Sequence, residues 1–131
     1  MKKKILVIDD NPMIIFSVKE GLENKFDAFS VDGAEGGKKC FELLEKGLIP
    51  DLILLDIMMP DMNGWDVYAR LQDNEAWKKI PIIFLTAKTD DYSKGFGKLV
   101  CEKYIEKPFE LDELAQSINQ TLEKKADSSD E

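Results

Sequence analysis

The chain has 131 residues, 44% of them hydrophobic, which fits one compact domain with its own core. Its 18 basic and 26 acidic residues give a formal net charge of -8, and this argues against direct nucleic-acid binding because phosphate contacts need clustered positive charge. Histidine is absent and the cysteines, Cys40 and Cys101, are far apart in the sequence. The common zinc sites and a histidine-based catalytic triad are therefore excluded, and a disulfide framework is not supported.

Membrane insertion and secretion are not indicated either. No segment approaches the roughly 18 to 20 apolar residues that a bilayer-spanning helix needs. The basic start, Met1 to Lys4, is followed only by the short apolar run from Ile5 to Ile8, which is too short for a signal peptide. We therefore expect a cytoplasmic protein without membrane contact.

The first predicted elements are a strand and a helix. The apolar run from Ile5 to Ile8 predicts a strand. Asn11 followed by Pro12 predicts a helix start, because an asparagine side chain caps free backbone amides and proline suits the first helical turn. Apolar residues then recur at four-residue spacing and predict one buried helical face: Ile14, Val18 and Leu22.

The next elements are predicted from alternation and turn residues. Apolar and polar residues alternate over 26–31, which is typical of a half-exposed edge strand, and Asp32-Gly33 predicts a turn after it. A second helix should follow and end near Gly47. Its expected buried face consists of Ala34, Gly37, Phe41 and Leu44.

The second half of the chain repeats this order. Residues 52–55 form a continuous apolar run of the kind found in a central strand, and 65–71 predict a short helix. A fourth strand is expected after Pro81, a fourth helix within 89–103, a fifth strand at 104–106 and a final helix along 111–122.

Strands alternating with helices predict an α/β fold, in which a parallel sheet with right-handed crossovers carries helices on both faces. There is no internal repeat and no sign of a second domain. We assign residues 1–125 to one domain and expect 126–131 to form a disordered acidic tail.

Candidate functional residues follow the predicted strands. Asp9 and Asp10 follow the first, Asp56 follows the third, and Thr86 and Lys107 end the fourth and fifth. Because the carboxyl ends of parallel strands meet at one edge of the sheet, we expect these side chains to lie together. Carboxylates there suit Mg²⁺, while a hydroxyl and an ammonium suit phosphoryl oxygens.

Alternatives remain at each position. Asp9 and Asp10 could simply cap the following helix, and Asp56 could be a turn residue, a metal ligand or a nucleophile that forms an acyl phosphate. Thr86 or Lys107 alone would more often be structural. Lys107-Pro108 is more specific, because the proline can lock the turn, including through a cis bond.

The chain resembles the receiver domain of two-component response regulators, and is similar to the single-domain chemotaxis type. The resemblance covers about residues 3 to 124. It depends on the order and spacing of Asp9-Asp10, Asp56-x-Met58-Met59-Pro60-x-x-x-Gly64, Thr86-Ala87 and Lys107-Pro108-Phe109. It implies a flavodoxin-like, doubly wound (βα)5 fold with strand order 2-1-3-4-5.

The resemblance also implies roles for individual residues. Asp56 would accept a phosphoryl group from a sensor histidine kinase, and Lys107 and Thr86 would contact that group. The Mg²⁺ ligands would be the carboxylates of Asp9, Asp10 and Asp56 and the backbone carbonyl of Met58. Thr86 and Tyr104 would form the switch, although Tyr104 could equally be an ordinary half-buried strand residue.

The implied function is a phosphorylation-dependent signalling switch without a separate enzymatic substrate. Its unidentified downstream partner would bind the surface formed by the fourth helix, the fifth strand and the fifth helix, and the protein would be a monomer or weak dimer. A phosphorelay intermediate that passes phosphate to a histidine phosphotransfer protein is an alternative.

Two other functions on related folds are open. A Mg²⁺-dependent aspartyl-phosphate phosphatase of the haloacid dehalogenase type would carry an aspartate at the position of Met58, and a large cap region. A flavodoxin-like electron carrier would need hydroxyl residues after the first strand, where this chain has Asp9-Asp10-Asn11-Pro12.

Overall fold

The computed structural model describes residues 2–87 and 103–129 and contains one five-stranded parallel sheet in the order β2-β1-β3-β4-β5. The predicted fold class and strand order are confirmed. The strands are β1 (Lys3–Ile8), β2 (Phe29–Ala34), β3 (Leu52–Asp56), β4 (Ile82–Ala87) and β5 (Lys103–Lys107). The helices are α1 (Pro12–Lys25), α2 (Gly37–Glu45), α3 (Gly64–Gln72) and α5 (Leu111–Ser129). The helix expected within 89–103 lies outside the described residues.

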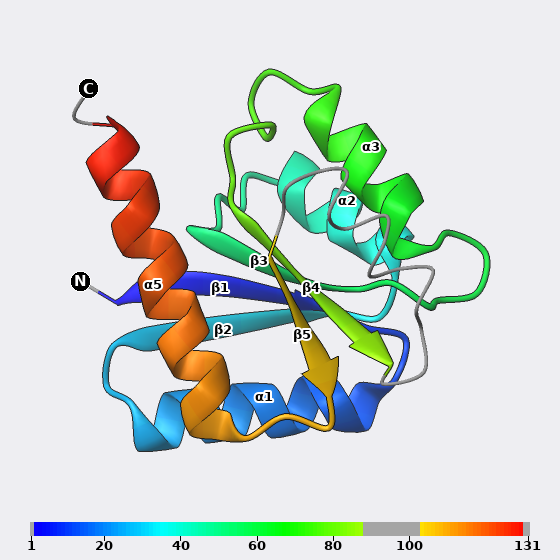
Figure 1. Cartoon of the computed structure of the whole chain (residues 1–131). Helices are drawn as coiled ribbons and strands as arrows, with labels where there is room; N and C mark the ends of the chain where they lie inside the picture. Colours follow the sequence, from blue (N-terminus) through cyan, green and yellow to red (C-terminus); the bar gives the residue numbers. More distant parts are fainter. Residues whose placement is uncertain (1, 88–102, 130–131) are drawn as a thin grey trace.

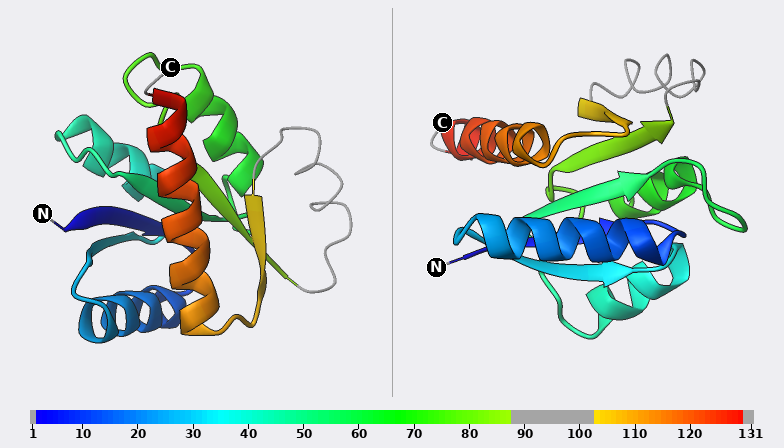
Figure 2. Two further views of the ribbon diagram at one scale, coloured as in Figure 1. Left: turned by 60° about the vertical axis from the view of Figure 1, so that its left-hand side comes forward. Right: turned by 90° about the horizontal axis from the view of Figure 1, so that it is seen from below.

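The sheet is covered on both faces. Helices α1 and α5 lie on one face, and α2 and α3 lie on the other (Figures 1 and 2). Successive residues of a strand point to opposite faces, so Ile5 and Val7 pack with α1 and α5 while Leu6 and Ile8 pack in the core next to α2 and α3. Every residue of β3 is buried, as expected of a central strand with helices on both sides.

Helix α1 begins as the sequence predicted. The Asn11 side chain accepts a hydrogen bond from the Met13 backbone N–H at 2.9 Å, and Pro12 is the first helical residue. Val18 and Leu22 are buried on the face toward the sheet. Because α1 starts only three residues after Asp9, its cap also fixes the backbone beside the end of β1.

Strand β2 differs from the prediction. It spans Phe29–Ala34 rather than 26–31, and α1 continues through Lys25. Asp32 and Gly33, predicted to form a turn, pair instead with Leu6 and Val7 of β1, because the parallel ladder continues to Ala34. The glycine is needed for packing, since a Cβ at Gly33 would lie 2.3 Å from Cγ2 of Ile15.

The start of α3 is held close to the end of β3. The Gly64 backbone N–H donates to the Ile57 carbonyl at 2.8 Å, and a Cβ at Gly64 would lie 2.5 Å from the Asp56 carbonyl oxygen. Asn63 and Asp66 form a reciprocal capping box at the same helix start. The loop after Asp56 is therefore fixed by a close approach that only glycine allows.

Helix α5 extends further than predicted. Its backbone is helical through Ser129, beyond the 111–122 predicted from the sequence, and the domain end assigned at 125 stays a prediction. Adding a residue such as alanine to an existing helix costs little, whereas starting a helix is unfavourable. Of the helices that the structure describes, none has the combination of length and apolar character required to cross a membrane.

Candidate functional site

Five of the predicted site residues lie along what we call the carboxyl edge, the edge of the sheet where the strands end. Figure 1 shows this edge. Asp56 is the last residue of β3 and Lys107 the last of β5, while Asp9 directly follows β1. Thr86 is the next-to-last residue of β4 and pairs with Glu106. The central strands thus bring residues from distant parts of the sequence into one place, as the parallel arrangement predicted.

Three carboxylates form the centre of the site. One ligand oxygen from each of Asp9, Asp10 and Asp56 lies within 4.8 Å of the others. Asp9 is fully buried and Asp56 is 4% exposed, whereas Asp10 is exposed. Two of the three carboxylates are therefore largely removed from water, which makes their mutual repulsion stronger than at the surface.

Asp9 makes two different hydrogen bonds. One carboxylate oxygen accepts the Asn11 backbone N–H at 2.9 Å, and the other accepts from the Lys107 ammonium at 2.7 Å. The first bond resembles the helix-capping role that we considered from the sequence, and the second joins the residue to the candidate site. The two interpretations of Asp9 are thus compatible.

Lys107 connects the two buried carboxylates. Its Nζ lies 2.7 Å from Asp9 Oδ2 and 3.2 Å from Asp56 Oδ1. Burial lowers the pKa of Lys107, but the hydrogen bond to Asp9 and the negative charges of Asp56 and Asp9 outweigh burial, so the pKa is raised. The lysine is therefore held in its charged form. The Lys107–Pro108 peptide bond is cis.

Asp56 has a strongly shifted pKa. Burial and the negative charge of Asp9 raise the pKa of the Asp56 carboxyl to about 6, although Lys107 opposes them. One lysine thus only partly compensates for the three carboxylates of the cluster. A divalent cation with a preference for oxygen ligands fits such a donor set, because it would relieve the remaining repulsion.

Thr86 contributes a hydroxyl that lacks a partner. The residue is fully buried, and its Oγ1 has no hydrogen-bond partner within the described part of the chain. A buried hydroxyl without a partner costs free energy, so a group that enters the site and accepts a hydrogen bond would be favoured here. The sequence predicted the position of Thr86 but could not show that its hydroxyl lacks a partner within residues 2–87 and 103–129.

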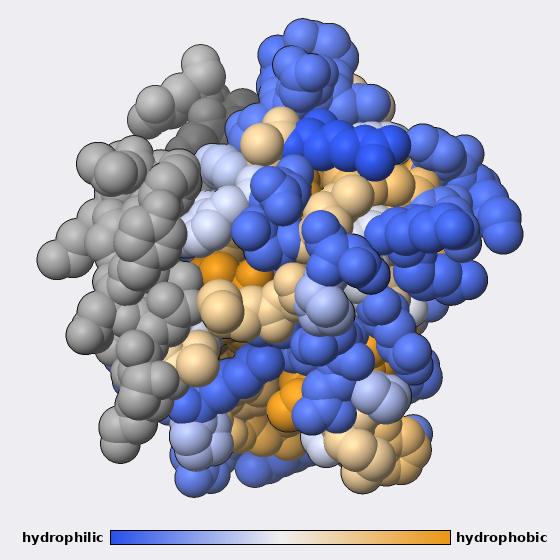
Figure 3. Space-filling model, turned by 90° about the vertical axis from the view of Figure 1, so that its right-hand side faces the viewer, coloured by the Kyte–Doolittle hydropathy of each residue, from blue (hydrophilic) through white to orange (hydrophobic). Residues whose placement is uncertain are grey.

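The remaining predicted residues lie beside this centre. Met58 follows β3 and its side chain is 64% exposed, and the role of its carbonyl as a ligand stays a prediction. Tyr104 pairs with Phe84 in the sheet and packs, partly buried, against the core near α2 and α3. This position fits an ordinary strand tyrosine, and a switching role for Tyr104 also stays a prediction. Figure 3, which faces this side of the molecule, shows hydrophilic residues interspersed with apolar ones.

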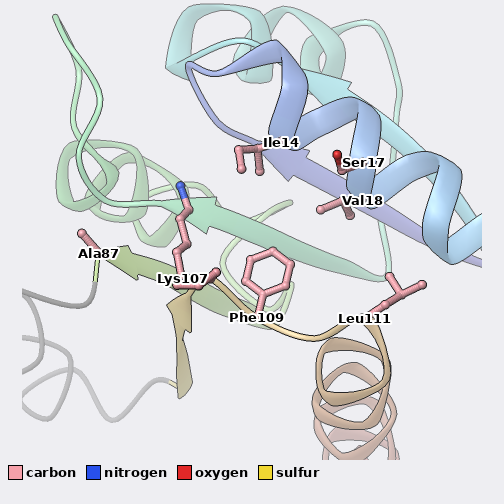
Figure 4. A pocket seen from close by; sticks show the side chains of 8 residues that line it. Ile14, Ser17, Val18, Ala87, Lys107, Phe109 and Leu111 are labelled. Carbon is pink, nitrogen blue, oxygen red and sulfur yellow. The ribbon is translucent and has the colours of Figure 1, made fainter.

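The sequence did not predict an apolar cavity that adjoins Lys107. It has a volume of about 490 Å³ and lies between α1 and the connection from β5 to α5. In Figure 4 the ring of Phe109 and the side chains of Ile14 and Val18 border it, while the nitrogen of Lys107 points away. The aliphatic part of Lys107 thus contacts apolar surface while its ammonium faces the carboxylates. No short sequence motif signals this cavity, because its lining comes from separate elements.

Comparison with known proteins gives one matching family model, the response regulator receiver domain, over residues 5–119. Response regulator Rre1 of Synechocystis is 34% identical over 128 residues, which are 96% of this chain and 54% of that protein. Transcriptional regulatory protein DltR of Streptococcus agalactiae is 42% identical over 116 residues, covering 88% of this chain and 50% of that protein. The chain spans about half the length of these curated relatives.

Solved structures agree with these matches. Chemotaxis protein CheY4 of Vibrio cholerae is 26% identical, with a TM-score of 0.82, and the match covers 92% of this chain and 99% of that one. The receiver domain of the Francisella response regulator 1452 is 27% identical, with a TM-score of 0.80, over 94% and 98% of the two chains.

Proposed function

Because the chain belongs to the response regulator receiver domain family, whose members act in two-component signalling, we propose that Asp56 accepts a phosphoryl group from a histidine kinase and that this event switches the protein. The observation that best supports the proposal is the contact of Lys107 with both Asp9 and Asp56 at the carboxyl edge. It places a nucleophilic carboxylate beside a fixed positive charge, an arrangement suited to phosphoryl transfer.

The transfer step would use an Asp56 carboxylate oxygen as nucleophile. This oxygen forms a bond to phosphorus while the bond between phosphorus and the donor histidine nitrogen breaks, and the electron pair stays on that nitrogen. With a pKa raised to about 6, Asp56 is mostly ionised at neutral pH and available for attack. The Asp56 carboxylate is also within 3.2 Å of the Lys107 ammonium, which limits its rotation.

Asp9, Asp10 and Asp56, together with the Met58 carbonyl, would hold Mg²⁺. The ion would supply positive charge to offset the repulsion between the carboxylates and the incoming phosphoryl oxygens. The clustered carboxylate oxygens and the raised pKa of Asp56 support this assignment.

Lys107 and Thr86 would detect the new phosphoryl group. The ammonium of Lys107 would bind a phosphoryl oxygen, and the hydroxyl of Thr86, which has no partner among the described residues, would gain an acceptor. A movement of Thr86 would leave space next to β4 that Tyr104, which pairs with Phe84 on the neighbouring strand, could enter. We propose that the output surface combines β5, α5 and the helix expected within 89–103.

The same proposal extends to the domain bounds, the phosphodonor and the downstream partner. Residues 1–125 would form the receiver domain, a sensor histidine kinase would be the donor, and an unidentified protein would read the output surface in the cytoplasm. The receiver would promote its own phosphorylation and dephosphorylation without a separate substrate, as a monomer or weak dimer. A phosphorelay role would instead require transfer from Asp56 to a second histidine.

A mass measurement tests the proposal. The protein is incubated with acetyl phosphate and Mg²⁺, and the intact mass of wild type is compared with those of Asp56→Ala and of Asp51→Ala, a control at the opposite edge of the sheet. We expect one phosphoryl adduct on wild type and on Asp51→Ala, and none on Asp56→Ala. An adduct that persists in Asp56→Ala would contradict the assignment of the nucleophile.

A further inference from the structure

Lysines gather at the opposite edge of the sheet, which we call the amino edge because the strands begin there. Strand β1 starts at Lys3, Lys79 lies shortly before β4, and Lys125 lies in the C-terminal part of α5. Figure 1 shows the N-terminus and the end of α5 on this side of the molecule, away from the strand ends that carry the carboxylates. The chain as a whole has a net charge of -8, so these lysines form a locally positive region on a negatively charged protein.

The same three lysines line one cavity of about 360 Å³. Its walls are apolar, because Ile80 is buried and Leu122 is partly buried, and Ile49 at the cavity is 73% exposed. The cavity therefore combines ammonium groups with an apolar surface that water covers in the isolated protein. Such a combination is suited to a ligand with both negative charge and an apolar group.

Three lysines and one carboxylate are among the described residues that line this cavity. The Lys125 ammonium donates a hydrogen bond to the Lys79 backbone carbonyl, which brings two lysine residues together. Burial and the positive charge of Lys79 lower the pKa of Lys125, and the negative charge of Asp51 opposes this shift only in part. Asp51 is the single carboxylate among the described lining residues, and it already accepts the Lys4 backbone N–H at 2.8 Å.

We propose that this cavity binds an acidic peptide segment of a partner protein that carries one apolar side chain. Carboxylates of the segment would pair with Lys3, Lys79 and Lys125, and the apolar side chain would cover Ile49 and Leu122. The charge complementarity favours an anionic partner in general. A peptide fits better than nucleic acid or a lipid surface, because its regularly spaced backbone N–H groups can donate to Asp51 while its carboxylates pair with the lysines.

This binding surface is independent of the phosphorylation proposed for Asp56. The amino and carboxyl edges lie at opposite ends of the strands, so a partner at the amino edge leaves Asp9, Asp56 and Lys107 accessible to a phosphodonor. An acidic partner would also be repelled by the carboxylates of the carboxyl edge, which directs it to the lysines. The amino edge would thus serve for tethering, and the carboxyl edge for signalling.

Fluorescence anisotropy with a labelled short peptide, in which glutamates flank a single leucine, tests the proposal. The matched variants are Lys79→Ala/Lys125→Ala and Lys38→Ala/Lys39→Ala; the second pair removes the same charge from exposed lysines of α2. We expect the first double variant to weaken binding about tenfold, which is about 1.4 kcal/mol, and the control to leave it nearly unchanged. The apolar contact is tested with Ile49→Ser and with a peptide whose leucine is serine, and each change should weaken binding.

Four results would overturn the proposal. The first is that the peptide does not bind wild type saturably, and the second is that both double variants weaken binding equally. The third is that neither the leucine replacement nor Ile49→Ser weakens binding. The fourth is that the protein binds anionic lipid vesicles more strongly than the peptide. Phosphoryl adduct formation on Asp56, measured on the same variants, should be unchanged. Loss of the adduct would count against the independence of the two edges, while failure of peptide binding would leave the proposal for Asp56 intact.

Discussion

The two edges of the sheet both concentrate charge, but they do so in different environments. At the carboxyl edge, Asp9 and Asp56 are buried and share a lysine at hydrogen-bond distance. At the amino edge, Lys3 and Lys79 are exposed to solvent. From this contrast we expect the burial of a charge to decide how strongly it acts on the fold.

Electrostatics explains the difference. Charges in a protein interior interact through a low effective dielectric constant, whereas exposed charges are screened by water and salt over about 8 to 10 Å at ordinary ionic strength. A change at the carboxyl edge should therefore alter stability strongly and depend on pH. A change at the amino edge should alter partner binding and hardly affect stability.

The largest effect is expected for Asp56→Asn, which removes a buried charge. Because the folded protein holds Asp56 at a pKa of about 6 against an ordinary 3.8, ionisation of this group opposes folding. In Mg²⁺-free buffer at pH 7.5, the variant should be roughly 2 to 3 kcal/mol more stable than wild type in urea unfolding, since each pKa unit corresponds to about 1.4 kcal/mol.

The pH dependence determines whether this explanation holds. The folded state keeps its proton on Asp56 between pH 3.8 and about 6 while the unfolded state has lost it, so wild type loses stability as pH rises through this window. The advantage of Asp56→Asn should therefore shrink as pH falls toward 4. Asp27→Asn, at a fully exposed carboxylate, is the control and should follow wild type. An advantage of Asp56→Asn that does not depend on pH would contradict the electrostatic cause.

Lys107→Met should have the next largest effect, in the opposite direction. Methionine can retain the apolar contacts of the lysine stem, but Asp9 and Asp56 lose their shared positive charge. We expect a loss of about 2 kcal/mol of unfolding free energy, less than for a fully buried pair because Lys107 is partly exposed. Combining it with Asp56→Asn should restore part of the loss, and strictly additive effects of the two substitutions would contradict the coupling.

The sequence predicted the fold wherever local signals and tertiary packing agree. Asn11 and Pro12 mark the start of α1, and the continuous apolar run of β3 becomes a strand buried on both faces. Prediction failed at Asp32-Gly33, where turn-forming residues lie inside β2 because pairing with β1 outweighs their local preference. Helix α5 continues beyond the predicted 111–122, because polar residues fit a solvent-exposed helix as well as a disordered segment.

At the candidate site, the sequence predicted which residues meet but not their individual environments. Asp9 and Asp10 are adjacent and chemically identical, yet one is buried and the other exposed, because the first lies at the end of a central strand and the second faces solvent. The bond from Lys107 to Asp9 joins residues 98 positions apart and depends on side-chain reach across the sheet. No sequence motif contains that information.

A smaller effect is expected from adding Mg²⁺, which should reduce the repulsion at the carboxyl edge. At ten times the dissociation constant, the ion should raise the unfolding free energy of wild type by about 1.4 kcal/mol. Trp65 lies at the start of α3, and its ring centroid is 4.5 Å from that of Phe84. Its fluorescence therefore offers a signal for the Mg²⁺ titration. Asp10→Asn should weaken the response while leaving Mg²⁺-free stability nearly unchanged, because Asp10 is exposed. An unaltered Mg²⁺ affinity in Asp10→Asn would contradict its role as a ligand.

The smallest effect is expected at the amino edge. Lys79→Ala should change the unfolding free energy by less than about 0.5 kcal/mol, because an exposed lysine loses little when it is truncated. High salt should remove even this difference, since the screening length falls to about 3 Å at 1 M. The same salt titration should leave most of the Lys107→Met effect in place, because the carboxylates that Lys107 contacts are buried. If Lys79→Ala instead cost more than about 1 kcal/mol in a way that salt does not remove, the lysine would support the fold, and the contrast between a structural edge and a binding edge would fail.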